Sequence, residues 1–117
     1  MKEDLLKIIN TYGAIEQLKY FQSEVFELNE AILEYRYDEN KIYPEVEQCL
    51  KKHIAEEIAD VLVMLNQFKE YYDISDDEIN KIMTEKIDRQ LERIRNKEIN
   101  ERIIDNIVNG GVKGEDN

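Results

Sequence analysis

The sequence predicts an all-α protein, an antiparallel bundle of long helices. Apolar residues recur every three or four positions along most of the 117 residues, which is the period of a helix with one buried face. Residues that punctuate strands and turns are scarce, with 4 Gly and 1 Pro, while a hydrophobic content of 42% is too high for a disordered chain. We expect one helical domain over residues 1–108, followed by a flexible tail at 109–117.

The first half of the chain is expected to form two helices. A short amphipathic helix over residues 2–11 is interrupted by Gly13. A long helix then runs from about residue 14 to residue 37, with apolar side chains spaced three or four apart throughout. The polar stretch "YDENKIY", residues 37–43, predicts a loop.

The second half is expected to be helical as well. Pro44 stands at a favourable first helical position and opens a segment that reaches about Tyr72. Ser75 and Glu78 have the spacing of a capping box and begin the next helix. A last, Ile-rich amphipathic segment covers residues 99–108. It fits equally a further helix within one chain and a surface that packs against a second copy.

Charge and cysteine usage restrict the class of protein. Acidic residues outnumber basic ones 27 to 16, giving a net charge of −11, which argues against bare nucleic acid as a partner. The single cysteine, Cys49, excludes an internal disulfide and fits a reducing compartment. No run of apolar residues is long enough to span a membrane. We therefore expect a cytoplasmic protein without a membrane partner, whose acidic groups are either solvated or bind cations.

Two pairs of acidic residues have the same i,i+3 spacing on successive helices. Glu24 and Glu27 form the first pair, and Glu57 and Asp60 form the second, directly before the apolar run "VLVML". The five residues of this run cover the whole circumference of a helix, so we expect them to be buried on all sides. Side chains three residues apart lie ~60° apart on one helix face. If the pairs face each other, they offer the oxygen ligands that Mg²⁺ prefers. The alternatives are solvated helix faces, or a salt bridge from Asp60 to an arginine or lysine.

Three motifs in order resemble a known family. "Q-x6-E-x-x-E-L-x-E-A-I", "EEIADVLVML" and "K-x3-Q-x2-R" are similar to the motifs of the MazG-like all-α nucleoside triphosphate pyrophosphohydrolases, over about residues 10–95. The resemblance implies a Mg²⁺-dependent enzyme, with Mn²⁺ as a possible substitute. Such an enzyme hydrolyses a nucleoside or deoxynucleoside triphosphate to the monophosphate and pyrophosphate. It also implies a homodimer or homotetramer.

The resemblance also implies a role for individual residues. One position departs from the family pattern, since Gln90 stands where relatives usually carry Asn. The implied metal ligands are Glu24, Glu27, Glu57 and Asp60; the implied phosphate contacts are Lys86 and Arg93; Gln17 and Gln90 are possible substrate contacts; and Glu27 or Glu56 would activate water.

A second class of function also fits the sequence. An acidic helical interaction or regulatory protein, such as a nucleic-acid mimic or a catalytically degenerate relative, would explain both the charge and the helices. It gives no reason for Asp60 to stand at the start of an apolar run. Neither reading predicts which base or sugar would be preferred.

Overall fold

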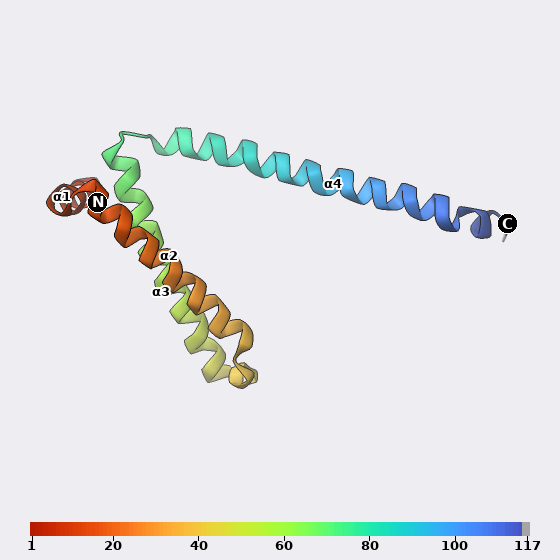
Figure 1. Cartoon of the computed structure of the whole chain (residues 1–117), viewed down its shortest axis with the longest axis horizontal. Coiled ribbons are helices and arrows are strands. Elements are labelled where there is room, and N and C mark those ends of the chain that lie inside the picture. The colour runs from red at the N-terminus through yellow and green to blue at the C-terminus, as the bar shows by residue number, and fades with distance from the viewer. Residues whose placement is uncertain (116–117) are drawn as a thin grey trace. The chain divides into compact units, whose positions relative to one another are not determined.

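The computed structural model describes residues 1–115, with side chains as far as residue 110, and consists of helices and the turns between them (Figure 1). The prediction of an all-α protein is confirmed, and the described residues contain no strand. The chain divides into two compact units, Met1–Ser75 and Asp76–Asn117. The antiparallel bundle and the single domain over residues 1–108 stay predictions.

Three helices form the first unit: α1 (Lys2–Tyr12), α2 (Ala14–Tyr37) and α3 (Pro44–Tyr71). The short 3₁₀ helix η1 (Glu39–Ile42) lies between α2 and α3, which run side by side in opposite directions (Figure 1). The helix bounds agree with the sequence prediction to within a residue or so.

The link between α2 and α3 is more ordered than the loop that was expected. The carboxylate of Asp38 accepts a hydrogen bond of 2.8 Å from the backbone N–H of Asn40, which starts η1. The backbone N–H of Tyr43 then donates to the Asn40 carbonyl at 3.0 Å. Aspartate competes well for nearby backbone N–H groups, so a polar stretch can form a defined turn without any apolar periodicity.

Gly13 sets the angle between α1 and α2. Its φ of +93° and ψ of 144° belong to a region that side-chain-bearing residues avoid. Its N–H still donates to the Ile9 carbonyl at 2.8 Å, and its carbonyl accepts from the N–H of Gln17 at 3.0 Å. The glycine therefore ends one helix and begins the next with both backbone groups bonded.

Replacing Gly13 by Ala should destabilise the protein by about 1–3 kcal/mol, the usual free energy of holding a residue in this backbone region. A Cβ at this position would meet no atom within 4 Å, so backbone strain alone should account for the loss. Gly110→Ala is the matched control, because it also meets nothing within 4 Å but lies in a helix, where alanine is favoured. Urea unfolding should give opposite signs for the two variants; equal effects would contradict the backbone explanation.

The apolar core of the first unit is small. The rings of Phe21 and Phe68 meet edge to face at 5.8 Å between centroids, joining α2 to α3. The expected burial of the run after Asp60 was wrong for most of its members: Met64 is 3% exposed, whereas Leu62 and Leu65 are 51% and 46% exposed. A helix that packs on one neighbour buries one stripe only, whatever its remaining composition. The buried apolar residues are Leu5, Ile9, Ala31, Leu50 and Met64.

The end of α3 is fixed by its backbone. Asp73 has a φ of +52°, its N–H donates to the Glu70 carbonyl at 3.2 Å, and the N–H of Ile74 donates to the Lys69 carbonyl at 2.9 Å. This is the bonding pattern of a Schellman motif, with an aspartate in the position that glycine usually takes.

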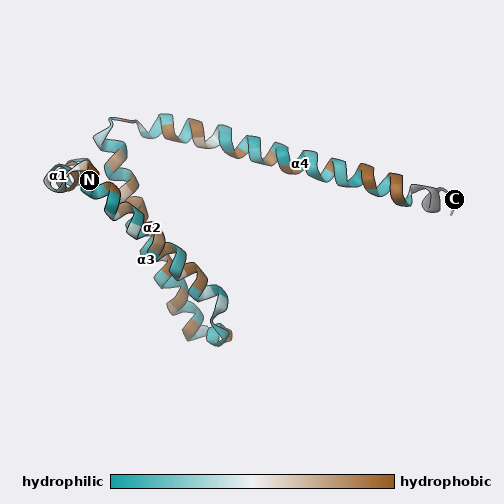
Figure 2. Cartoon of the chain, in the orientation of Figure 1, coloured by the Kyte–Doolittle hydropathy of each residue, from teal (hydrophilic) through white to brown (hydrophobic). Residues whose placement is uncertain are grey.

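The second unit contains one helix, α4 (Asp76–Glu115). The separate segments expected up to Ile94 and over residues 99–108 are continuous, since neither glycine nor proline occurs between residue 76 and Gly110. Figure 2 shows apolar residues distributed along its described length. The predicted tail at 109–117 lies for the most part outside the residues whose side chains are described. None of the described helices combines the length and apolarity needed to cross a membrane.

Candidate metal centre

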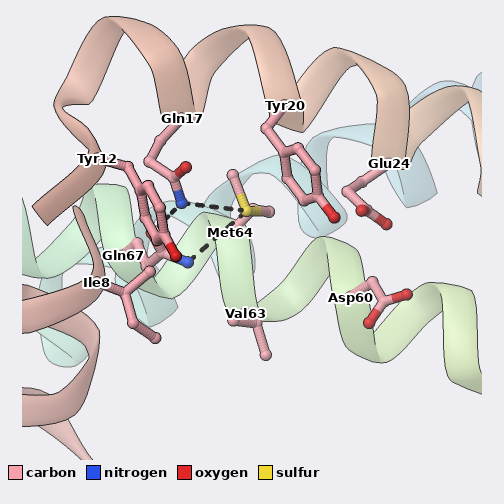
Figure 3. Close-up of a pocket in the computed structure, with 9 residues that line it drawn as sticks. All are labelled: Ile8, Tyr12, Gln17, Tyr20, Glu24, Asp60, Val63, Met64 and Gln67. Atoms are coloured by element: carbon pink, nitrogen blue, oxygen red, sulfur yellow. Dashed lines mark hydrogen bonds between the residues drawn. The ribbon is translucent and has the colours of Figure 1, made fainter.

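Three carboxylates converge between α2 and α3. Glu24 comes from α2, and Glu57 and Asp60 come from one face of α3, where their i,i+3 spacing places them a turn apart. Each offers one oxygen, and these oxygens lie within 4.8 Å of one another. Figure 3 shows Glu24 and Asp60 on the two facing helices. We refer to Glu24, Glu57 and Asp60 as the carboxylate cluster.

The cluster contains buried oxygens without partners. Glu24 is 6% exposed, and the Glu57 side chain is 13% exposed. Oε2 of Glu24 and Oε2 of Glu57 are both buried and have no hydrogen-bond partner among the described residues. Burying an unpaired carboxylate oxygen is unfavourable, so these two oxygens are candidates to bind a cation or a proton.

The raised pKa of the Glu24 carboxyl also indicates a site that favours a cation or a proton. Burial raises the pKa of the Glu24 carboxyl, and the negative charges of Glu27 and Asp60 raise it further. Hydrogen bonding with Tyr20 acts in the opposite direction but does not reverse the shift in pKa. A cation bound beside Glu24 would remove the need for a proton there.

The salt-bridge explanation for Asp60 finds no support in the described part of the chain. No lysine or arginine forms an ion pair with the carboxylate cluster there, and His53 is the basic side chain that contacts it. A group of three carboxylates with one histidine and no lysine or arginine beside it fits a hard divalent cation such as Mg²⁺, which completes its shell with water or phosphate oxygens. The residues present could therefore hold a metal ion.

His53 lies between two carboxylates. Its Nε2 is 3.3 Å from Oε1 of Glu57, and its Nδ1 is 3.4 Å from Oε2 of Glu34 on α2. Sequence reasoning gave His53 no role. The i,i+4 spacing of His53 and Glu57 could have predicted their contact, because it places the two side chains on one face of α3.

Two further predicted carboxylates lie outside the cluster. Glu27 is exposed on α2, one turn beyond Glu24, and does not contribute to the group of converging oxygens. Its charge nevertheless acts on Glu24, so it lies near the site. Glu56 is exposed and precedes Glu57 on α3. The three-carboxylate cluster is thus smaller than the four-ligand set that the resemblance implied, and a role for Glu27 or Glu56 in activating water stays a prediction.

A pocket of about 520 Å³ adjoins the cluster. Glu24 and Asp60 line one end of it, and the side-chain amides of Gln17 and Gln67 line the other (Figure 3). Met64 lies between the two ends. Tyr12, Tyr20, Ile8 and Val63 complete the wall.

The two glutamines form a buried pair. Nε2 of Gln17 donates to Oε1 of Gln67 at 2.8 Å, and both residues contact the sulfur of Met64. Gln17 is 8% exposed and Gln67 is 2% exposed. The sequence prediction named Gln17 but missed Gln67. A pattern that could have found Gln67 is its spacing of seven residues from Asp60. Seven residues are about two helical turns, so the two side chains lie on the same face of α3.

The predicted phosphate contacts belong to the second unit. Lys86, Gln90 and Arg93 line one depression of about 190 Å³ on α4, together with Arg89. Spacings of three and four residues place all of them on one helix face. Arg89 was not predicted, although it shares this spacing. Binding of phosphate by Lys86 and Arg93 stays a prediction, as does a role for Gln90.

The fold and the cluster together define an all-helical protein with a candidate divalent-metal centre beside a pocket. Comparison with protein families, with curated proteins and with solved structures gives no match for this chain. The resemblance to MazG-like pyrophosphohydrolases therefore stays a prediction.

Proposed function

We propose that this protein is a Mg²⁺-dependent nucleoside triphosphate pyrophosphohydrolase that converts its substrate to the monophosphate and pyrophosphate. The observation that carries the proposal is the pair of buried, unpartnered oxygens on Glu24 and Glu57, beside Asp60 and at the end of a pocket. The identity of the reaction rests on the motif resemblance, whereas the metal site rests on this geometry.

Glu24, Glu57 and Asp60 would hold Mg²⁺, or Mn²⁺ in its place. The bound ion would supply charge neutralisation for the triphosphate and a more acidic water. Divalent cations between protein and substrate also explain how a chain with a net charge of −11 could bind a polyanion. The proposal is thus consistent with the charge balance that argues against nucleic acid as a partner.

The remaining roles are proposed from the chemistry of the side chains and from the motif resemblance. Glu27, whose charge acts on Glu24, or Glu56, which precedes Glu57 on α3, would accept a proton from the attacking water. The pocket falls within the usual ligand-binding range of about 300–1,000 Å³, and its amides and tyrosine rings suit a heterocyclic base. The motif resemblance, and not a position relative to the pocket, assigns Lys86 and Arg93 to the pyrophosphate that leaves; the two share one face of α4 with Gln90.

We also propose that the protein is a cytoplasmic homodimer or homotetramer. The first unit leaves Leu62 and Leu65 about half exposed, and α4 leaves Ile87 and Leu91 about half exposed. Exposed apolar side chains in such number are typical of surfaces that pack against another chain. The single cysteine supports a reducing compartment.

Pyrophosphate release from a panel of nucleotides tests the proposed function. We expect the purified chain with millimolar Mg²⁺ to release pyrophosphate from at least one triphosphate, and a chelator to stop the reaction. Mg²⁺ or Mn²⁺ should also raise the melting temperature, since a ligand at 100 times its Kd stabilises by about 2.7 kcal/mol. KCl at matched ionic strength is the control. A melting temperature that follows ionic strength alone would instead support an acidic interaction protein.

A further inference from the structure

The two oxygens of Glu57 have different surroundings. Oε1 lies 3.3 Å from Nε2 of His53, whereas Oε2 is buried and has no hydrogen-bond partner among the described residues. The carboxylate is therefore in contact with His53 through one oxygen. Its other oxygen is available to a cation at the carboxylate cluster, to which Glu57 belongs.

His53 is itself held from the neighbouring helix. Nδ1 of its ring lies 3.4 Å from Oε2 of Glu34 on α2, so Glu34, His53 and Glu57 form a chain that crosses from α2 to α3. Carboxylates stand beside both ring nitrogens of His53, whose side chain is 43% exposed, and they favour one orientation of the imidazole. The contact through Nε2 in turn favours one rotamer of Glu57.

We propose that His53, oriented by Glu34, is a positioning residue that holds Glu57 in the conformation that binds the metal ion. The inference rests on the proposed metal site and adds to it a supporting pair that the motifs do not contain. A ligand that is already oriented loses less conformational freedom on binding. Outer partners of metal ligands commonly contribute 10–100-fold, in order of magnitude, to metal affinity.

Electrostatic repulsion alone predicts that removing His53 would strengthen metal binding. A histidine beside three carboxylates, when protonated, competes with a metal cation, so removing it should strengthen metal binding if electrostatics decided the outcome. If His53 acts by positioning Glu57, its removal should weaken metal binding. The sign of the change therefore distinguishes the two roles.

Mn²⁺ titration calorimetry on the full chain, at a single pH, tests the inference. We expect His53→Ala to weaken Mn²⁺ binding by about 10–100-fold. Glu34→Gln should weaken it less, since His53 keeps its contact with Glu57. His53→Gln should recover part of the affinity because its amide can still reach Glu57. Lys52→Ala is the matched control: the neighbouring residue on α3 is exposed, and losing its charge should leave affinity unchanged or increase it.

The outcomes separate this inference from the proposed function. If the wild type binds no Mn²⁺, the metal site itself is wrong. If the wild type binds Mn²⁺ and His53→Ala binds it equally well or more tightly, the positioning role is overturned while the site stands. Melting of each variant without metal shows whether it is folded; if His53→Ala is not, the comparison of Glu34→Gln with wild type decides in the same way.

Discussion

Asp60→Asn is expected to lower the rate of pyrophosphate release by more than about 100-fold, because even the outer partners of metal ligands contribute about 10–100-fold. Asn keeps the size of the side chain but loses the negative charge that would hold the cation. Asp60 is exposed, and Asn removes its repulsion of the Glu24 carboxylate, so the substitution should not destabilise the fold. The loss of rate would then report on metal and substrate binding, not on folding.

Two measurements make the Asp60 result decisive. The rate should be measured over a range of Mg²⁺ concentrations, since a weakened ligand set shifts the concentration that gives half of the maximal rate. Asp4→Asn is the control, because Asp4 is an exposed aspartate in the first turn of α1, away from the cluster. Turnover by Asp60→Asn at the wild-type rate would remove Asp60 from the site.

Glu24→Gln should stabilise the protein in the absence of metal and remove its stabilisation by Mg²⁺. The buried carboxylate is unfavourable when charged and unpaired, and a neutral amide of the same size avoids that charge. The amide is also a poorer ligand for Mg²⁺, so the variant should no longer melt at a higher temperature when Mg²⁺ is added. Wild type and variant would thus respond to the ion in different ways.

The pH dependence of this difference follows from the raised pKa of Glu24. Between the usual carboxyl pKa of the unfolded chain and the higher pKa of the folded protein, the folded state binds more protons. The metal-free wild type therefore loses stability as pH rises through that range. Glu24→Gln lacks this titration. Its gain in the free energy of unfolding over wild type should therefore be full above the pKa of Glu24 in the folded protein, and it should disappear below the carboxyl pKa of the unfolded chain.

Urea unfolding in chelator across a pH series measures that advantage. Glu30→Gln is the control, since Glu30 is an exposed glutamate on the same helix and should show no comparable pH dependence relative to wild type. A Glu24→Gln variant that is less stable than wild type at neutral pH would show that the Glu24 carboxylate is not unfavourably buried. A variant that is still stabilised by Mg²⁺ would show that Glu24 is not a metal ligand.

The helices were predictable because their signals are local. The bounds of α2 and the start of α3 follow from apolar periodicity, from Gly13 and from Pro44, which act on the backbone within a few residues. The i,i+3 spacing of Glu57 and Asp60 is local in the same sense, and the structure places the two on one face. Order between α2 and α3 was missed because the Asp38 cap leaves no periodic pattern.

Burial was less predictable than helix position. The run after Asp60 was expected to be surrounded on all sides, yet Leu62 and Leu65 are half exposed within this chain. Composition states which residues favour burial, but the amount buried depends on how many neighbours a helix has. Conversely, Gln17 and Gln67 are buried although glutamine is usually exposed, because the Gln17 amide donates a hydrogen bond to the amide oxygen of Gln67.

Patterns along the chain were enough to predict that this protein is helical, where its first three helices begin and end, and which acidic pairs share a helix face. Those properties depend on residues a few positions apart. The packing of α2 on α3 is what brings Glu24 to Glu57 and Asp60, leaves Glu27 outside their group, and puts His53 between Glu34 and Glu57. Such contacts join residues from different helices, and they depend on the rotation of one helix against the other, which a pattern along a single helix does not specify.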